Sequence, residues 1–489
     1  MKYSKNQKIK LRFNDIGSDG EGIGRTGDGA TFFVKGALPG EEAECTVLKW
    51  KNSYGYAKLD TLTVSSKDRV TPVCPIADKC GGCTLQHLDY KAQLEWKRNK
   101  VLGCLERIGG FEGIEVLPTL GMEQPLYYRN KAQFPVKGGD PVKIGFYAGH
   151  THAVIDTESC YIQAPVINEI LKVFRGFVNE KKISVYDEEA GKGLLRHILI
   201  RTGFETGEVC VCPVINGNKL PFWEEFKDAA STACEKLNHK LTTFAININT
   251  EKTNVILGNK VVTLWGKEYI TDKLGEVSYC ISPLSFYQVN PVQTRKIYDT
   301  VRDMAGLTGH ETLWDIYCGA GTIGLYLSDS VKELVGIEIV PEAIEDAKRN
   351  AKANGVGNVE YYCGAAEEVL PVLVREKGKT ADVAVIDPPR KGCDAALLNT
   401  LLDVCPEKII YVSCDPATLA RDLKLLCAGK YSIRQVRPVD AFCQTTHVET
   451  CCLLERLRNT KEHISFTLDM EDYYRIKDTE VDKKNDSTN

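Results

Sequence analysis

The chain has 489 residues, of which 43% are hydrophobic, so we expect about two to four domains with well-filled cores. A formal net charge of −4 excludes a strongly basic protein, although a near-neutral chain can still carry a basic face for nucleic acid. The first residues lack the apolar core of a signal peptide, and no run of about eighteen apolar residues is present, so we expect no membrane partner.

Residues 1–62 are predicted to form a small β-barrel. Short alternating strands, such as 9–13 and 42–47, are separated by glycines. Their number and length suit a five-stranded barrel of the OB type, a common oligonucleotide-binding scaffold. The segment Gly20–Arg25 together with Phe32–Glu41 resembles the TRAM domain of RNA-modifying enzymes. The basic residues at the N-terminus are either a solvated face or a contact for phosphates.

The 19 cysteines are odd in number and irregularly spaced, which favours a reducing cytoplasm over a secreted disulfide framework. Three of them, Cys74, Cys80 and Cys83, lie in one short loop with proline and glycine, so their thiols can converge on a metal centre. The best candidate for a fourth ligand is Cys160, in another polar turn. The residues alone leave zinc and an iron–sulfur cluster open, and unrelated core cysteines are the alternative.

A helix is predicted over residues 85–108, ending at two glycines, and it can pack on the catalytic domain. Residues 111–280 read as mixed strands, so that 63–280 form a central α+β domain. Basic and aromatic residues alternate or lie close together in three segments, 127–134, 145–152 and 195–201. This composition suits base stacking and phosphate binding, while ordinary amphipathic strands are the alternative.

From residue 281 to 457 strands and helices alternate, which predicts a Rossmann-like, doubly wound parallel sheet. A strand over 312–317 precedes a glycine-rich turn and a helix, and Glu338 ends the next strand. The glycines and Glu338 would suit the ribose of either NAD or S-adenosylmethionine, so a dehydrogenase is a rival interpretation. Asp315 within the strand, followed by Tyr317-Cys-Gly-Ala-Gly, favours a methyltransferase.

A strand ending in Asp387-Pro-Pro-Arg390 places a rigid loop at the carboxyl edge of the sheet. Amino-methyltransferases use a related loop with an aromatic residue where this chain has Arg390. A second loop, Ser413–Pro416, carries Cys414 at the tip of another strand. Together the two loops favour methylation at carbon rather than at nitrogen. The alternative is that Cys414 is a small, inert core residue.

Methylation at carbon 5 of uracil explains why a cysteine and a carboxylate are needed. Carbon 5 is a weak nucleophile until a thiolate adds to carbon 6, and a base must later remove the carbon-5 proton. Glu449 lies on an apolar strand over 448–454, where a carboxylate needs a reason. A solvent-facing Glu449 at the strand end is the alternative.

Taken together, these motifs resemble the RumA/TrmA-like family of RNA uracil-5-methyltransferases over residues 8–457. The subgroup with a TRAM domain and an iron–sulfur cluster methylates 23S rRNA. The resemblance implies a 4Fe–4S cluster on Cys74, Cys80, Cys83 and Cys160. It implies S-adenosylmethionine contacts at Gln288 (in Ser285–Asn290), Tyr317, Glu338 and Asp387. It also implies Cys414 as the nucleophile and Glu449 as the base.

We therefore expect a cytoplasmic enzyme that methylates carbon 5 of uridine in 23S rRNA and needs no obligate protein partner. One alternative is a tRNA uracil-5-methyltransferase of the same family. Another, of a different class, is an iron–sulfur RNA-binding protein with a vestigial methyltransferase fold. Residues 458–489 form a polar tail whose end is expected to be disordered.

Overall fold

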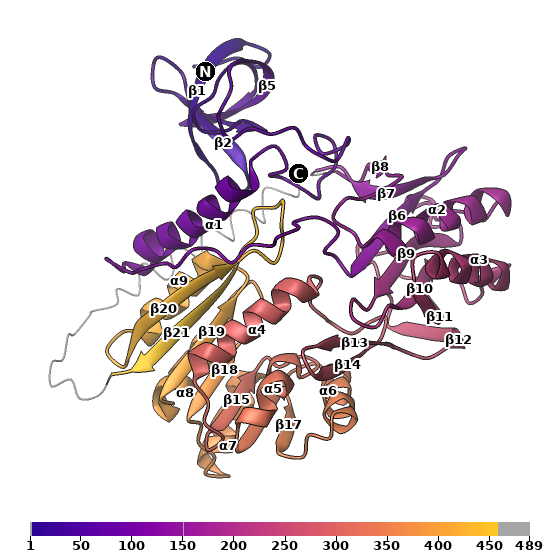
Figure 1. Ribbon diagram of the computed structural model, residues 1–489. Helices are drawn as coiled ribbons and strands as arrows, with labels where there is room; N and C mark the ends of the chain where they lie inside the picture. Colours follow the sequence, from indigo (N-terminus) through magenta and orange to yellow (C-terminus); the bar gives the residue numbers. More distant parts are fainter. Residues whose placement is uncertain (1, 150, 458–489) are drawn as a thin grey trace.

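The computed structural model describes residues 2–149 and 151–457, and the predicted polar tail at 458–489 lies outside this range. Figure 1 shows a small barrel at one end, a central sheet with its helices to one side, and a larger α/β sheet below. No helix among the described residues is long and apolar enough to cross a membrane. The domain division at residues 62, 280 and 457 stays a prediction.

The N-terminal strands close into a five-stranded barrel in the order β1-β2-β3-β5-β4, as expected. These strands are β1 (Lys8–Ile16), β2 (Glu21–Arg25), β3 (Thr31–Lys35), β4 (Glu42–Trp50) and β5 (Tyr54–Val64). Alternate residues point inward, including Phe13 and Phe32. Gly24 is required where β2 passes Phe13, because an added Cβ would lie 2.8 Å from that ring.

The central region contains a seven-stranded sheet in the order β12-β11-β10-β9-β6-β7-β8. Its strands are β6 (Lys131–Lys137), β7 (Lys143–Tyr147), β8 (Val154–Asp156), β9 (Leu195–Thr202), β10 (Glu208–Ile215), β11 (Lys240–Ile248) and β12 (Lys260–Gly266). Two helices that sequence analysis did not identify cover one face, α2 (Pro165–Glu180) and α3 (Trp223–Glu235). Pro165 at the first turn and the apolar spacing that follows were the available signals for α2.

Helix α1 (Tyr90–Cys104) continues into a π-helical turn, Leu105–Gly109. It begins later than predicted because Asp89 caps it, accepting hydrogen bonds from the backbone N–H groups of Lys91 and Ala92. The helix packs against α9 (Pro416–Leu426) and β20 (Tyr431–Val439), both in the C-terminal half. Helix α1, which precedes the central sheet in the chain, thus packs on the catalytic domain, as expected.

The C-terminal sheet has the order β17-β16-β15-β18-β19-β21-β20. Its remaining strands are β15 (Thr312–Ile316), β16 (Glu333–Glu338), β17 (Val359–Cys363), β18 (Val383–Ile386), β19 (Lys408–Ser413) and β21 (Glu449–Arg456). The first five strands of this order are parallel, and β21 is antiparallel between β19 and β20. An all-parallel dinucleotide-binding sheet has no such strand, so the topology disfavours the dehydrogenase interpretation.

Helices cover both faces of this sheet. On one face lie α4 (Pro291–Ala305), α5 (Thr322–Leu327) and α6 (Pro341–Ala353), and on the other lie α7 (Ala366–Arg375), α8 (Ala395–Val404) and α9. A two-stranded ribbon, β13 (Ile270–Leu274) and β14 (Val277–Ile281), packs against α4, α5 and α6. The ribbon carries the chain from the central sheet into the catalytic sheet.

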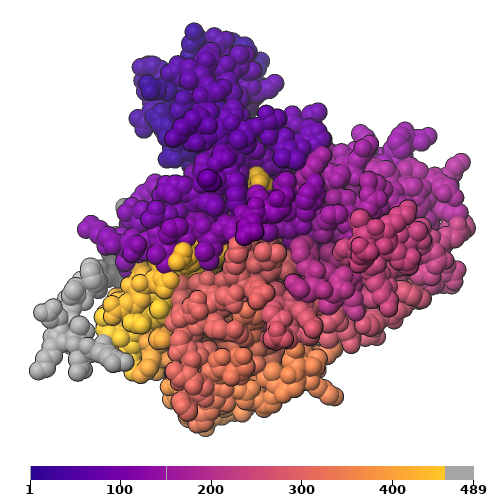
Figure 2. All heavy atoms as spheres, in the orientation of Figure 1, coloured from indigo at the N-terminus to yellow at the C-terminus, as the bar shows by residue number. Residues whose placement is uncertain are grey.

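The segment 440–447, which we call the anchor loop, is fixed by residues from the N-terminal half. Lys97 Nζ lies 2.5 Å from Asp440 Oδ1, and both side chains are fully buried. Tyr90 OH also donates to Asp440, and Gln93 Nε2 donates to Gln444 Oε1. Figure 2 shows a small yellow area of C-terminal chain enclosed by violet N-terminal segments. Since Glu449 follows this loop directly, α1 helps to set where β21 begins.

Candidate functional site

Five of the predicted site residues gather at one edge of the catalytic sheet. Because β15, β16, β18 and β19 are parallel, their carboxyl ends meet there, and the antiparallel β21 starts at the same edge. The residues brought together are Tyr317, Glu338, Asp387, Cys414 and Glu449. A strand end thus supplies the nucleophile candidate, and a strand start supplies the base candidate.

Cys414 and Glu449 meet where β19 ends and β21 begins. The last pair of the β19–β21 ladder is Ser413 with Thr450; Cys414 follows Ser413 directly, Glu449 precedes Thr450, and the charge of Glu449 acts on the Cys414 thiol. Glu449 is 4% exposed, whereas Cys414 is half-buried. Cys414 also precedes Asp415, the N-cap of α9, and the positive end of this helix dipole favours a thiolate.

Burial and neighbouring carboxylates shape the protonation of this pair. Burial, with smaller contributions from Glu449 and Asp387, raises the pKa of Cys414 to about 11. Burial, followed by repulsion from Asp387, raises the pKa of Glu449 to about 8. Arg390 acts against both shifts, so it favours the thiolate and the carboxylate. Sequence analysis identified no activator for the thiol, because nothing in the sequence shows that Arg390 lies near Cys414.

Asp387 and Asp315 extend this row of buried acids toward the glycine-rich turn. Burial and then Asp315 raise the pKa of Asp387 to about 7, and burial raises that of Asp315 to about 7 despite a bond from Gly324 N–H. The Gly324 N–H donates to Asp315 Oδ2 over 2.8 Å, while Oδ1 is buried with no partner among the described residues. This edge therefore holds an unsatisfied acceptor beside the predicted cofactor turn.

The turn after β15 fits a nucleoside next to Glu338. Glu338 accepts hydrogen bonds from the N–H groups of Gly319 (3.1 Å) and Val340 (2.9 Å). Gly319 has a φ of +54°, and open space lies where its Cβ would be. Ile339 and Val340 are 60% and 45% exposed and present an apolar surface beside the carboxylate. These groups suit an adenosyl ring and ribose, the part of the cofactor that Glu338 is predicted to contact.

Tyr317 lies in this turn, and Gln288 lies in the segment between β14 and α4. Tyr317 has a φ of +67° in the turn itself, and its ring packs against the core between the sheet and α7, α8 and α9. Gln288 is half-buried, and its carbonyl accepts a hydrogen bond from Asn130 Nδ2 over 3.0 Å. Phe286, close before it, is 71% exposed. Sequence analysis did not single out Phe286, and only its exposure marks it as a base-stacking candidate.

The four predicted cluster cysteines, Cys74, Cys80, Cys83 and Cys160, line one cavity of about 290 Å³. Asn168 holds Cys160 from both sides, accepting from its N–H (2.9 Å) and donating to its carbonyl (3.1 Å). Burial raises the pKa of Cys83 to about 12 and that of Cys160 to about 11. Among the described residues, no three side chains of His, Cys, Asp or Glu lie close enough to hold a single metal ion.

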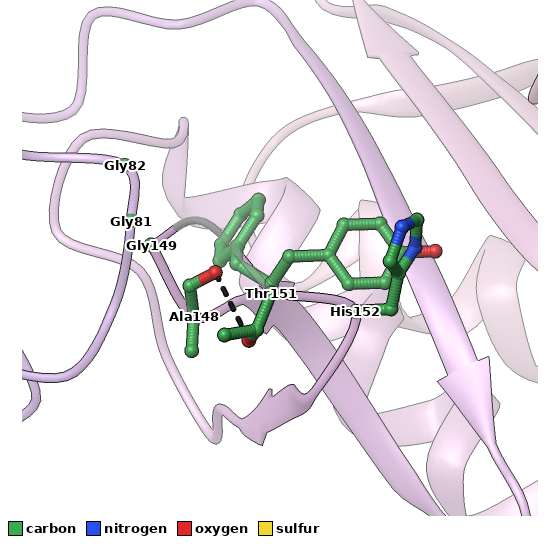
Figure 3. A pocket seen from close by; sticks show the side chains of 8 residues that line it. Gly81, Gly82, Ala148, Gly149, Thr151 and His152 are labelled. Carbon is green, nitrogen blue, oxygen red and sulfur yellow. Dashed lines mark hydrogen bonds between the residues drawn. The ribbon is translucent and has the colours of Figure 1, made fainter. Parts of the chain in front are cut away.

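The cysteine loop rests on the turn that follows β7. The Gly81 N–H donates to the Tyr147 carbonyl over 3.1 Å, and Cys80 forms a β-bridge with Ala148. An open hollow of about 520 Å³ lies between the two segments, where Thr151 Oγ1 donates to the Ala148 carbonyl (Figure 3). An added Cβ at Gly81 would lie 3.1 Å from the N–H nitrogen of Gly149, so this close approach needs a glycine.

The raised pKa of Glu449 predicts a pH-dependent effect of Glu449→Gln on stability. Between its ordinary value of 4.5 and about 8, the unfolded chain loses the proton while the folded chain keeps it. Wild-type stability therefore falls over this window, by at most about 1.4 kcal/mol per pH unit, and the variant escapes the loss. The Tm of the variant minus that of wild type should rise from pH 5 to 8 and then level off. The exposed Glu276, in the turn between β13 and β14, is the control, because Glu276→Gln should give a flat difference, and a flat difference for Glu449→Gln would contradict the assignment.

Comparison with known proteins places this architecture in a family. The family model described as tRNA (Uracil-5-)-methyltransferase matches residues 218–457, and the TRAM domain model matches residues 4–59. An uncharacterized RNA methyltransferase of Clostridium acetobutylicum is 45% identical over 93% of this chain and 98% of its own, and one of Halalkalibacterium halodurans is 44% identical over 92% and 98%.

A solved structure supports the same placement. The structure of Pyrococcus abyssi tRNA (uracil-54, C5)-methyltransferase in complex with S-adenosyl-L-homocysteine aligns with a TM-score of 0.73 and 29% identity. The alignment covers 91% of this chain and all of that one. The shared α/β fold and the TRAM barrel agree with the matches in sequence. The chain belongs to the S-adenosylmethionine-dependent RNA (uracil-5-)-methyltransferase family and carries an N-terminal TRAM domain.

Proposed function

We propose that the protein methylates carbon 5 of a uridine in 23S rRNA, using Cys414 as nucleophile and Glu449 as base. The proposal rests on the proximity of Cys414 and Glu449, each next to the last pair of the β19–β21 ladder, at the edge that also holds Glu338 and Asp387. A buried acid and a half-buried thiol, both within the field of Arg390, suit a reaction that needs an adduct and a proton acceptor.

The two side chains divide the reaction between them. The Cys414 thiolate adds to carbon 6 of the uracil, and the electron pair of the 5,6 double bond moves to make carbon 5 nucleophilic. When bound, S-adenosylmethionine would supply the methyl group from its sulfonium to carbon 5 and would leave as S-adenosylhomocysteine. Glu449 then accepts the carbon-5 proton, and the bond between carbon 6 and Cys414 breaks as the double bond re-forms. Arg390 favours the thiolate at the start and the carboxylate in the proton-transfer step.

A tRNA uridine is the second candidate substrate. The Pyrococcus abyssi enzyme, named for uracil 54 of tRNA, covers 91% of this chain, so the coverage extends beyond the central and catalytic regions. The barrel alone therefore does not decide between rRNA and tRNA. For 23S rRNA we rely on the combination of barrel and cysteine cavity, which is typical of the rRNA subgroup of the family.

We also propose that Cys74, Cys80, Cys83 and Cys160 hold a 4Fe–4S cluster. Four thiolates are the donor set of an iron–sulfur cluster and also suit a single zinc ion, so the metal content decides between the two. A cluster binds one thiolate at each of its irons, so its four cysteines need only surround a common cavity, as these do. Bound there, the cluster would tie the loop before α1 to the loop before α2.

The cluster proposal predicts a brown protein after anaerobic purification. Iron and acid-labile sulfide should be present at about four per chain, with a broad visible absorbance. Cys83→Ser should lose most of the iron, whereas Cys363→Ser, which alters an exposed cysteine far along the chain, should retain it. Zinc in place of iron, or full iron in Cys83→Ser, would contradict the proposal.

The catalytic roles predict that Glu449→Gln traps a covalent intermediate. Without a base the carbon-5 proton stays, so the bond to Cys414 cannot break and RNA should migrate with the protein on a denaturing gel. The double variant Cys414→Ala/Glu449→Gln should show no such band, while both variants still bind S-adenosylmethionine by calorimetry. A band that persists in the double variant would assign the nucleophile to another residue.

The substrate is identified by mapping 5-methyluridine in RNA from cells with and without the gene. We expect one or more positions of 23S rRNA to lose the modification when the gene is deleted, and to regain it with wild type but not with Cys414→Ala. Loss confined to tRNA would establish the second candidate instead. Unchanged rRNA and tRNA would refute both.

A further inference from the structure

Two cationic side chains near the active site have no anionic partner. Arg129 and Lys131 lie on either side of Asn130 where β6 begins, and both line the 290 Å³ cavity. Within residues 2–149 and 151–457, neither side chain makes a hydrogen bond or an ion pair. Burying a cation without a counter-charge costs free energy, so these groups are poised for an anion.

A third cation, Arg201, lies on the neighbouring strand β9. The β6–β9 ladder pairs Lys131 with Arg201, which is 3% exposed and donates from one terminal nitrogen to the Ser285 carbonyl. Its Nε is buried without a partner among the described residues. Burial, followed by Arg201 and Arg129, lowers the pKa of Lys131 to about 7. Three basic side chains are therefore concentrated at this wall of the cavity.

The carboxylate that favours the charged form of Arg201 already accepts hydrogen bonds from other residues. Asp346 favours the charged form of Arg201, but its Oδ2 accepts a hydrogen bond from Ser285 Oγ at 2.6 Å and its Oδ1 one from Arg349 at 2.8 Å. For Arg129 and Lys131, the described residues supply no carboxylate at hydrogen-bonding distance. Lys131 relieves its burial in part by losing its proton near neutral pH, and a bound anion would favour its charged form.

The position of the cations points to RNA. Asn130, between them, donates from its backbone N–H to the Val289 carbonyl over 2.9 Å and from its side chain to the Gln288 carbonyl. Thr445 of the anchor loop lines the same cavity, four residues before Glu449. The cations thus share a cavity with the cysteines and are linked through Asn130 to the segment of Gln288, a predicted cofactor contact.

A buried acceptor completes the cavity. Gln163 is 2% exposed and lines the cavity, and its Oε1 has no partner among the described residues. Two cations and one acceptor are complementary to a ribonucleotide, which offers a phosphate and a 2′-hydroxyl donor. An inorganic cluster offers negative charge but no such donor, so Gln163 favours RNA.

We propose that Arg129 and Lys131 bind a backbone phosphate next to the target uridine, while Gln163 accepts a hydrogen bond from a ribose 2′-hydroxyl. Arg201 adds to the field from behind and touches no RNA itself. The inference rests on the proposed function only in taking RNA as the substrate. It assigns this cavity a second role beside the predicted cluster, as the binding site of the RNA backbone.

The test is the salt dependence of RNA binding by the full-length protein. The probe is a fluorescein-labelled, 20-nucleotide single-stranded RNA with one uridine, followed by anisotropy across a KCl series. In Arg129→Gln/Lys131→Gln the slope of log Kd against log[KCl] should fall by about 0.7 for each phosphate that the variant no longer neutralises. The control Lys219→Gln/Lys236→Gln removes two exposed charges next to α3, on the far side of the central sheet, and should keep the wild-type slope.

Neutral linkages locate the phosphate. Replacing one phosphate beside the uridine with a methylphosphonate should weaken binding to wild type about as much as the double substitution does, and should not weaken binding to the double variant further. Substituting deoxyribose at the same nucleotide should weaken wild type but not Gln163→Ala. Iron content and S-adenosylmethionine affinity should match wild type in every variant.

Three results would overturn the inference: an unchanged slope in the double variant, an equal fall in the control, or reduced iron with an intact slope. The last would assign the cations to the cluster. Tritium release from carbon-5-labelled uridine RNA is measured in parallel on wild type. If the wild-type protein releases no tritium but the binding slopes are as expected, the proposed function is refuted and the phosphate-binding site is still supported.

Discussion

The candidate active site depends on one antiparallel strand, β21, which lies between β19 and β20 at the edge where the proposed catalytic residues meet. A parallel sheet presents only the carboxyl ends of its strands to a ligand, and in this chain those ends hold the cofactor side and Cys414. Because β21 runs the other way, its first residue, Glu449, arrives at the same edge, one position beyond the last pair of the β19–β21 ladder. Cys414 follows the last residue of β19 directly, so the ladder brings the proposed base and the proposed nucleophile to the same place in the sheet.

Burial and neighbouring carboxylates favour the protonated forms of Cys414 and Glu449, and the exposed Arg390 acts against both effects. Burial is the main cause of the raised pKa values of Asp387, Glu449 and Cys414. Asp315 also raises the pKa of Asp387, Asp387 also raises that of Glu449, and Glu449 and Asp387 both raise that of Cys414. Arg390 lies on the rigid Asp-Pro-Pro-Arg loop at the mouth of the site, exposed to solvent. An exposed cation is screened by water until a substrate covers it, so its field on the thiol strengthens as the site fills.

Local sequence signals predicted the parts of this protein whose causes are local. Alternating strands and glycines indicated the barrel, and the strand–turn–helix pattern after Thr312 indicated the core of the catalytic sheet. Cys414 could be placed at a strand tip for the same reason. The four cysteines could be grouped because loop spacing restricts where thiols can converge, and they line one cavity.

The features that sequence analysis missed depend on pairing between distant segments. No local pattern shows that β21 enters the sheet between β19 and β20, or that Lys97 neutralises Asp440 from a helix far earlier in the chain. Arg390 and Cys414 belong to different loops and meet only because β18 and β19 are neighbours. Helix α2 was different, since Pro165 at its first turn and the apolar spacing after it were local signals that were overlooked among the strands.

The place of β21 in the sheet also constrains how the enzyme is made. It is the last described strand in the chain, yet it occupies an interior position, with β20 beyond it at the edge. During synthesis β20 leaves the ribosome first and has no neighbour in the sheet until β21 follows. The nascent chain can therefore complete its barrel, central sheet and cofactor turn while still lacking Glu449, the proposed base. With that assignment, a chain that ends before β21 has the proposed nucleophile but lacks the group proposed to release it from the product.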